Sequence, residues 1–173
     1  MRPRSINKQA EGLTLVETLV AIGLLTTLVF AVFGAVSSGF QASAHARDQV
    51  VAGLLAQEAI ETIRNARDQN LVARTAWLDG LGECETANGC KVDVHAASMV
   101  SSCGTGGCEA LKYDDSTGRY GYDAGWGASR YTREVMISED TPGEATITAS
   151  VSCGGSRTVV IEETLYDLRA GEE

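Results

Sequence analysis

The sequence predicts an α+β protein in which a long N-terminal helix packs on a small C-terminal antiparallel β-sheet. Residues 13–36 form an apolar run with one charge, and an amphipathic helical pattern follows as far as residue 69. Residues 129–168 contain three predicted strands, and in the second of them, residues 145–153, apolar and polar side chains alternate strictly, as in a half-buried strand. Residues 70–128 are rich in glycine and cysteine, which indicates an irregular connecting region pinned by disulfides. Residues 169–173 are expected to form a tail.

The charge distribution limits the classes of partner. The 173 residues carry a net charge of −9, whereas Arg2, Arg4 and Lys8 make the first twelve residues basic. An acidic body argues against charge-driven binding to nucleic acid, whose phosphates attract Lys and Arg, and against charge-driven binding to anionic lipid. We therefore expect no direct binding to nucleic acid.

The apolar run of residues 13–36 has the length of a membrane-spanning helix, which needs about 20 residues. The basic residues before it place the N-terminus in the cytoplasm and the acidic body outside. A cleaved secretory signal is an alternative, with residues 42–44 or 44–46 as small-residue cleavage sites. An uncleaved signal anchor is another alternative. Neither explains Glu17, because a charge at the centre of a membrane helix costs about 2.5–3.5 kcal/mol.

Residues 12–17 read Gly-Leu-Thr-Leu-Val-Glu and lie between a short basic leader and the apolar helix. This pattern resembles the processing site of type IV prepilins and pseudopilins. In that family a membrane-embedded aspartyl peptidase cuts after the glycine and methylates the new amino terminus. The resemblance implies that residues 1–12 are a leader peptide, that Gly12 and Leu13 flank the cleavage site, that Leu13 is N-methylated, and that Glu17 is the assembly glutamate.

The resemblance also implies a function. The chain would be a structural subunit of a type IV pilus-like or type II secretion-like filament, and not an enzyme. It would wait in the cytoplasmic membrane with its C-terminal part outside and then enter a cell-surface or periplasmic filament. Its partners would be a prepilin peptidase, other pilin subunits, an assembly ATPase and membrane platform proteins. The similarity of residues 56–65 to the spine of minor pilins favours a minor pilin or pseudopilin.

Two residues depart from the family pattern. The family most often has Phe where this chain has Leu13, and many pilins have a helix-bending proline where it has Gly34. A membrane-anchored extracellular binding module or enzyme that is stabilised by disulfides and does not polymerise is the competing hypothesis. The filament system, whether adhesion, motility, DNA uptake or secretion, is left open.

The helical pattern continues past the membrane boundary. Residues 37–69 repeat apolar side chains at helical spacing, and residues 37–39 are its weakest point. Arg64 and Asp68 are spaced to form an i,i+4 ion pair. Glu58 and Glu61 lie one turn apart without a histidine at helical spacing, so we interpret them as a solvated face or subunit contact and not as metal ligands.

All five cysteines lie in the second half of the chain, and four of them form two short-range pairs: Cys84 with Cys90 and Cys103 with Cys108. A domain outside the membrane favours disulfides. The C-x5-C and C-x4-C spacings differ from those of zinc sites. Four cysteines allow three connectivities, of which adjacent pairing is the simplest. Cys153 falls on the apolar phase of a strand and is expected to be buried.

The three predicted strands begin near Tyr131, Ala145 and Thr158, with turns at residues 141–143 and 154–155. A three-stranded meander with one face covered by the amphipathic half of the helix is the simplest arrangement.

Few side chains suggest chemistry. His45 and His95 are isolated, and no nucleophile, phosphate-loop or metalloprotease motif is present. Residues 113–118 are acidic and fit either a turn or a weak calcium site, although the EF-hand spacing is absent; we expect no cofactor. A group of aromatic residues in the glycine-rich region fits either a ligand-contacting surface or loop aromatics that pack over a thin core: Tyr113, Tyr120, Tyr122 and Trp126.

Overall fold

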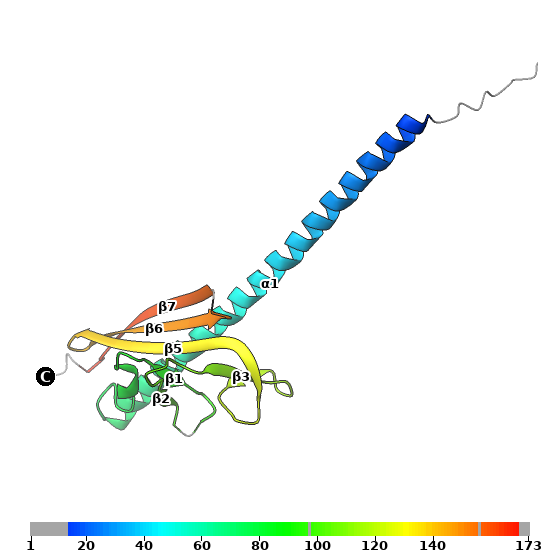
Figure 1. Cartoon of the computed structure of the whole chain (residues 1–173). Helices are drawn as coiled ribbons and strands as arrows, with labels where there is room; N and C mark the ends of the chain where they lie inside the picture. Colours follow the sequence, from blue (N-terminus) through cyan, green and yellow to red (C-terminus); the bar gives the residue numbers. More distant parts are fainter. Residues whose placement is uncertain (1–13, 97, 156, 170–173) are drawn as a thin grey trace, which may run out of the picture. The chain divides into compact units, whose positions relative to one another are not determined.

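The computed structural model describes residues 14–96, 98–155 and 157–169, and the chain forms two compact units (Figure 1). The N-terminal unit is Met1–His45 and the C-terminal unit is Ala46–Glu173. Helix α1 (Leu15–Ala73) is followed by a short 3-10 helix, η1 (Gly82–Cys84), and seven strands. The strands are β1 (Cys90–Val92), β2 (Val100–Ser102), β3 (Ala110–Asp114), β4 (Arg119–Gly121), β5 (Gly127–Thr141), β6 (Glu144–Cys153) and β7 (Arg157–Tyr166).

Helix α1 has 59 residues and ends four residues later than the apolar pattern predicts. Arg74 adopts a left-handed backbone with φ 59°. The Arg74 amide donates to the Leu71 carbonyl (3.3 Å) and the Thr75 amide donates to the Asn70 carbonyl (3.1 Å). These two bonds form a Schellman motif, which usually contains glycine at the left-handed position. Because arginine and not glycine occupies the left-handed position, the sequence does not show where the helix ends.

Strands β5, β6 and β7 form the predicted antiparallel meander. Val135 pairs with Ala149, and Ala149 in turn pairs with Ile161. Gly154 and Gly155 both adopt positive φ, 58° and 76°, in the turn between β6 and β7, where a side chain would be strained. The alternation in β6 therefore places its apolar side chains on one face of the sheet, as predicted.

The irregular region predicted for residues 70–128 contains more regular structure than expected. Its four strands extend the meander to a seven-stranded sheet in the order β2-β1-β5-β3-β4, with β6 on β5 and β7 on β6. All strand pairs are antiparallel. The prediction was wrong here because β1, β2 and β4 have only three residues each, too few to show a period. They are held by distant partners, such as Cys90 on Val135.

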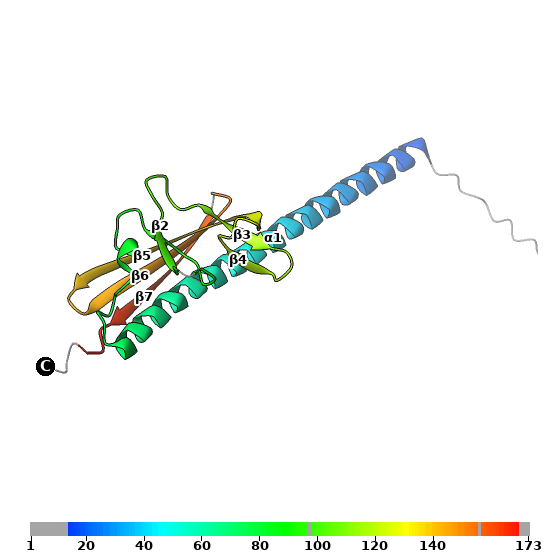
Figure 2. The same cartoon turned by 90° about the horizontal axis from the view of Figure 1, so that it is seen from below.

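The core lies between the sheet and the part of α1 that belongs to the C-terminal unit (Figure 2). Ala56, Ala59 and Ile63 of α1 are fully buried, and so are Val135 of β5 and Ile147 of β6. The small side chains at positions 56 and 59 leave room for a close approach between helix and sheet. The predicted arrangement, an amphipathic helix that covers the inner face of an antiparallel sheet, is confirmed for this unit.

The predicted ion pair between Arg64 and Asp68 is wrong. Arg64 instead forms ion pairs with Glu61 and with Glu163 of β7. Asp68 pairs with Arg67 at 2.6 Å. The expected i,i+4 pair does not form because the edge strand β7 brings the Glu163 carboxylate to Arg64. The Arg64–Glu163 pair joins the helix to the sheet.

Candidate assembly site and the contacts that support it

The residues assigned to processing, Gly12 and Leu13, lie outside the described residues. Glu17 lies in the first turn of α1. There its carboxylate is favoured by the partial positive charge of the helix N-terminus. The position is thus near one end of the apolar run, and not at the centre, where a charge costs most.

Thr14 caps the helix and was not singled out from the sequence. Its Oγ1 accepts a hydrogen bond from the backbone N–H of Glu17 at 3.3 Å. A Thr followed three residues later by Glu is the signature of a capping box, which would have found this residue. The bond uses the backbone of Glu17 and leaves its carboxylate available for another partner.

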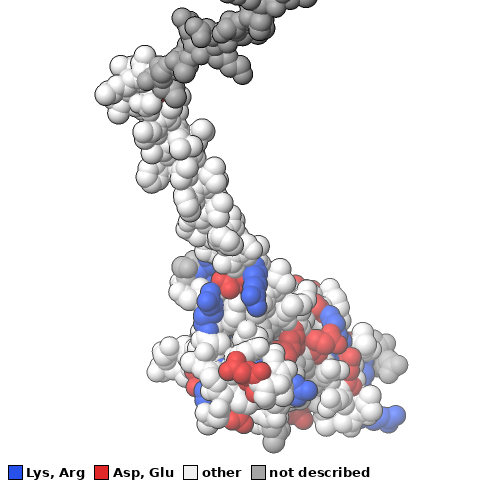
Figure 3. Space-filling view, turned by 90° about the vertical axis from the view of Figure 1, so that its right-hand side faces the viewer, with Lys and Arg blue, Asp and Glu red and all other residues white. Residues whose placement is uncertain are grey.

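The apolar stretch of α1 has an almost uniform surface. No Lys, Arg, Asp or Glu occurs between Glu17 and Arg47, and apolar side chains such as Leu15, Phe30 and Phe40 are about three-quarters exposed. In Figure 3 the charged side chains gather on the C-terminal unit, and the described part of the N-terminal unit is almost entirely white. Helix α1 is long and apolar enough to cross a membrane.

Three hydroxyl groups within this stretch are satisfied by the helix itself. Thr18 Oγ1 donates to the Leu15 carbonyl at 2.9 Å. Thr26 and Thr27 bond in the same way to the carbonyls three residues before them, at 2.9 and 2.8 Å. A polar group without a partner is costly in lipid, so these bonds make the stretch compatible with a bilayer and leave Glu17 as its one charged group.

A buried arginine joins α1 to the sheet in the C-terminal unit. The Arg133 side chain on β5 has no exposed surface and forms an ion pair with Glu58 at 2.8 Å. It also donates to the Leu55 carbonyl at 2.9 Å and to the Val92 carbonyl. Glu58 is therefore an internal partner and not a purely solvated group, whereas Glu61 pairs with Arg64 at the surface. The sequence signal for this pair was an arginine on the inward phase of a strand.

A second cluster joins the two elements near the start of the C-terminal unit. Asp48 of α1 accepts a hydrogen bond from the Tyr131 hydroxyl at 3.1 Å and forms an ion pair with Arg130 at 3.0 Å. Burial raises the pKa of Asp48, but the hydrogen bond from Tyr131 and the charge of Arg130 outweigh it, so the pKa is lowered. The pKa of Tyr131 is raised to about 12, mainly by burial and to a smaller extent by the hydrogen bond to Asp48. The half-buried free thiol of Cys153 lies opposite Tyr131 on β6.

The other four cysteines form the two adjacent disulfides. Cys84–Cys90 has a Cα–Cα distance of 4.6 Å and both residues are fully buried. Cys103–Cys108 has a Cα–Cα distance of 4.4 Å, and the loop between these two cysteines is exposed. The first bridge connects η1 to β1, which pairs with the central strand β5.

The acidic segment 113–118 forms a turn. Asp114 Oδ1 accepts bonds from the Ser116 amide (2.9 Å) and hydroxyl (2.7 Å), and Oδ2 accepts one from the Thr117 hydroxyl (2.5 Å). These bonds lower the pKa of Asp114 to about 2. The carboxylate is thus engaged by its own turn. Within residues 14–96, 98–155 and 157–169, no group of three or more His, Cys, Asp or Glu side chains is placed to hold a metal ion.

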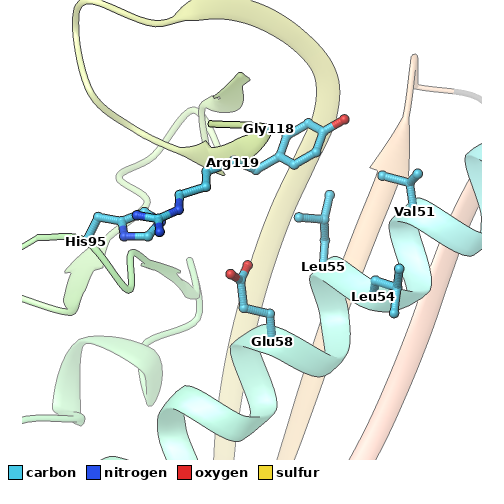
Figure 4. Close-up of a pocket in the computed structure, with 8 residues that line it drawn as sticks. Val51, Leu54, Leu55, Glu58, His95, Gly118 and Arg119 are labelled. Carbon is cyan, nitrogen blue, oxygen red and sulfur yellow. The ribbon is translucent and has the colours of Figure 1, made fainter. Parts of the chain in front are cut away.

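An open groove of about 520 Å³ lies between α1 and the β3–β4 turn (Figure 4). Val51, Leu54 and Leu55 form its apolar side, and Arg119 at the start of β4 and His95 in the loop after β1 also line it. Tyr120 also lines the groove, and its ring packs against that of Tyr113, with ring centroids 4.9 Å apart.

Comparisons with protein families, with curated proteins and with solved structures find no match to this chain.

Proposed function

We propose that this chain is a structural subunit, a minor pilin or pseudopilin, of a type IV pilus-like or type II secretion-like filament. The observation that carries the proposal is the single carboxylate, Glu17, in the first turn of an exposed apolar helix that begins at Leu15, within the prepilin-like residues 12–17. An ordinary membrane anchor has no use for this carboxylate, because a charge in contact with lipid is unfavourable.

The proposed chemistry of assembly follows from the spacing. Cleavage after Gly12 frees the α-amino group of Leu13, which becomes N-methylated and remains a cation. Glu17 follows four residues later in the sequence, in the first turn of α1. The cation and the carboxylate neutralise each other, within one chain or between neighbouring subunits, which offsets the cost of holding either charge among apolar helices.

The proposed location follows from the charges around the helix. The basic leader with Arg2, Arg4 and Lys8 stays in the cytoplasm, and the acidic C-terminal unit with its disulfides lies outside. Polymerisation then transfers the apolar helix from lipid to a bundle of identical or related helices. This process requires a prepilin peptidase, an assembly ATPase and platform proteins in the same membrane.

The N-terminus of the mature chain tests the proposal. The full chain is expressed with a prepilin peptidase and its mass is measured. A species that begins at N-methyl-Leu13 is expected, and Gly12→Val should prevent its formation. Gly39→Ala is the matched control, because a Cβ at this helical position meets nothing within 4 Å. Retention of Met1, or a start near Ala46, would support a plain anchor or a cleaved secretory signal instead.

A further inference from the structure

A second pocket lies in the loops of the C-terminal unit and takes no part in the proposed assembly. Its volume is about 280 Å³, near the lower end of the range for small-molecule sites. Its walls come from the loop after β1 and from the loop between β4 and β5. The lining residues are Asp93, His95, Ala96, Tyr122, Asp123 and Trp126.

The two carboxylates of this pocket are held in place by their own loops. Asp93 Oδ1 accepts a hydrogen bond from the His95 amide at 3.0 Å. Asp123 Oδ1 accepts one from the Gly125 amide at 2.8 Å. Each bond engages one carboxylate oxygen, and no bond among the described residues engages the other. The pocket therefore contains two oriented acceptors with free capacity for a ligand.

The aromatic walls are also fixed. The Trp126 ring lies against Gly121, where a Cβ would come within 2.8 Å of the ring. The His95 ring meets it edge-on, with centroids 5.9 Å apart. The Tyr122 hydroxyl is buried without a hydrogen-bond partner among the described residues, and burial raises its pKa to about 12. A site formed before the ligand arrives loses little conformational entropy on binding.

The chemistry of the walls limits the classes of ligand. Two carboxylates repel anions. The Lys91 ammonium group lies 5.3 Å from the centroid of the Tyr122 ring and pairs with Glu109 at 2.8 Å, so this ring already interacts with a cation. The described residues also include no three-ligand group for a metal ion. Neutral molecules with several hydroxyl groups fit these walls, because hydroxyls donate strong bonds to carboxylates and sugar C–H faces pack on aromatic rings.

We propose that the pocket between Asp93, Asp123 and Trp126 binds a neutral hexopyranose unit, such as the terminal sugar of a surface glycan. The two free carboxylate oxygens accept bonds from sugar hydroxyls, and the ring of Trp126 covers one apolar face of the sugar. This inference does not depend on the proposed filament function, since it rests on contacts within the C-terminal unit alone.

The test is a titration of the full chain in a polyoxyethylene detergent, which contains neither a sugar nor a quaternary ammonium group. The chain has two tryptophans, so the two indole N–H signals in an NMR spectrum report separately on Trp126 and on the buried Trp77. The ligands are the methyl glycosides of glucose, galactose and mannose. Tetramethylammonium is titrated separately and represents the alternative class of cationic ligands. We expect at least one glycoside to shift the Trp126 signal saturably while the Trp77 signal stays in place.

Variants then assign the contacts. Asp93→Asn and Asp123→Asn should each weaken the binding of that glycoside about tenfold, as the loss of a charged acceptor does. Both retain an oxygen for the loop bond, and an unmoved Trp77 signal shows that they are folded. Asp115→Asn, an exposed aspartate in the β3–β4 turn, should bind as the unaltered chain does. A response to tetramethylammonium alone, no response to any ligand, or unchanged affinity in both pocket variants would overturn the proposal.

Discussion

At the scale of single residues, one buried arginine shows how the helix is held on the sheet. Arg133 lies on an inward phase of β5, between apolar residues, and its two terminal nitrogens bond to Glu58 and to two backbone carbonyls. A buried charge that loses its partner destabilises a protein far more than a surface charge does. Two glutamates one turn apart on α1, Glu58 and Glu61, should therefore differ strongly in their contribution to stability.

We expect Glu58→Gln to lower the free energy of unfolding by about 1–3 kcal/mol, because Arg133 then keeps its charge without a counter-ion. Glu61→Gln is the matched control. Its side chain is 57% exposed in a surface pair with Arg64, so its effect should stay within about 0.5 kcal/mol. Urea unfolding of the full chain in detergent, followed by tryptophan fluorescence, measures both. Equal effects would show that the Arg133 pair has no special role.

Asp48 should make stability depend on pH. Its pKa in the folded chain lies below the ordinary value of 3.8. Its contribution is therefore fully present above that value and is lost as the pH falls through the lower pKa of the folded state. The urea midpoint of Asp48→Asn should differ most from that of the unaltered chain at neutral pH, and the difference should shrink toward pH 3. Asp115→Asn, on an exposed turn, should follow the unaltered chain, and a constant Asp48→Asn difference would contradict the assignment.

The residues of the candidate site could be predicted from sequence to different degrees. Glu17 was found because a charge is rare in an apolar run, and the alternation of β6 placed Cys153 on the inner face of the sheet. The thiol is half-buried, and not buried as expected, because it lies at the end of the strand. Arg133, Asp48 and the pocket around Trp126 were not found. The inward phase of Arg133 was visible in the sequence, but the partners of all three lie on segments far apart in the chain.

At the scale of elements, the long helix and the long strands could be predicted from the pattern of their apolar residues, whereas the short strands could not. Strands β6 and β7 have ten residues each; β6 shows a visible alternation, and β7 was predicted from the run of residues 158–161 that begins it. Strands β1 and β2 have three each and exist because β1 adds to the free edge of β5. The end of α1 depends on Arg74 in a left-handed conformation, which the residue type does not indicate.

The two disulfides should differ in their effect on this region. Loss of the fully buried Cys84–Cys90 bridge, by Cys84→Ala with Cys90→Ala, should lower stability by about 2–4 kcal/mol, because it also leaves a cavity beside β1. Loss of Cys103–Cys108 by the same substitutions should cost less, since its loop is exposed. Urea unfolding measures both pairs.

Thiol labelling is the control for this comparison. Iodoacetamide under denaturing, non-reducing conditions should label Cys153 alone in the unaltered chain. Labelling of all five cysteines would show that the bridges do not form, and an equal loss of stability in the two double variants would contradict the difference in their roles.

At the scale of the whole molecule, the two units have different surfaces. The N-terminal unit exposes apolar side chains and one carboxylate, whereas the charged side chains gather on the C-terminal unit (Figure 3). Such an apolar surface requires lipid or other apolar helices around it. An anchor and a filament subunit both meet this requirement, so the carboxylate of Glu17 must distinguish them.

We expect Glu17→Ala to be cleaved after Gly12 as usual but to enter filaments poorly, because the freed amino group of Leu13 then has no carboxylate partner among the apolar helices. The measurement compares the chain in sheared filaments with the chain left in the membrane, in the organism that produces it.

Thr14→Ala is the control for a simple effect on the helix start, because it removes the bond from the Glu17 amide and costs about 1 kcal/mol. Glu17→Ala leaves that backbone bond in place. If helix capping were the main role of residues 14–17, Thr14→Ala would reduce incorporation at least as much as Glu17→Ala; if the carboxylate neutralises the new N-terminus, only Glu17→Ala should do so. Normal incorporation of Glu17→Ala would leave a membrane anchor as the better account of α1.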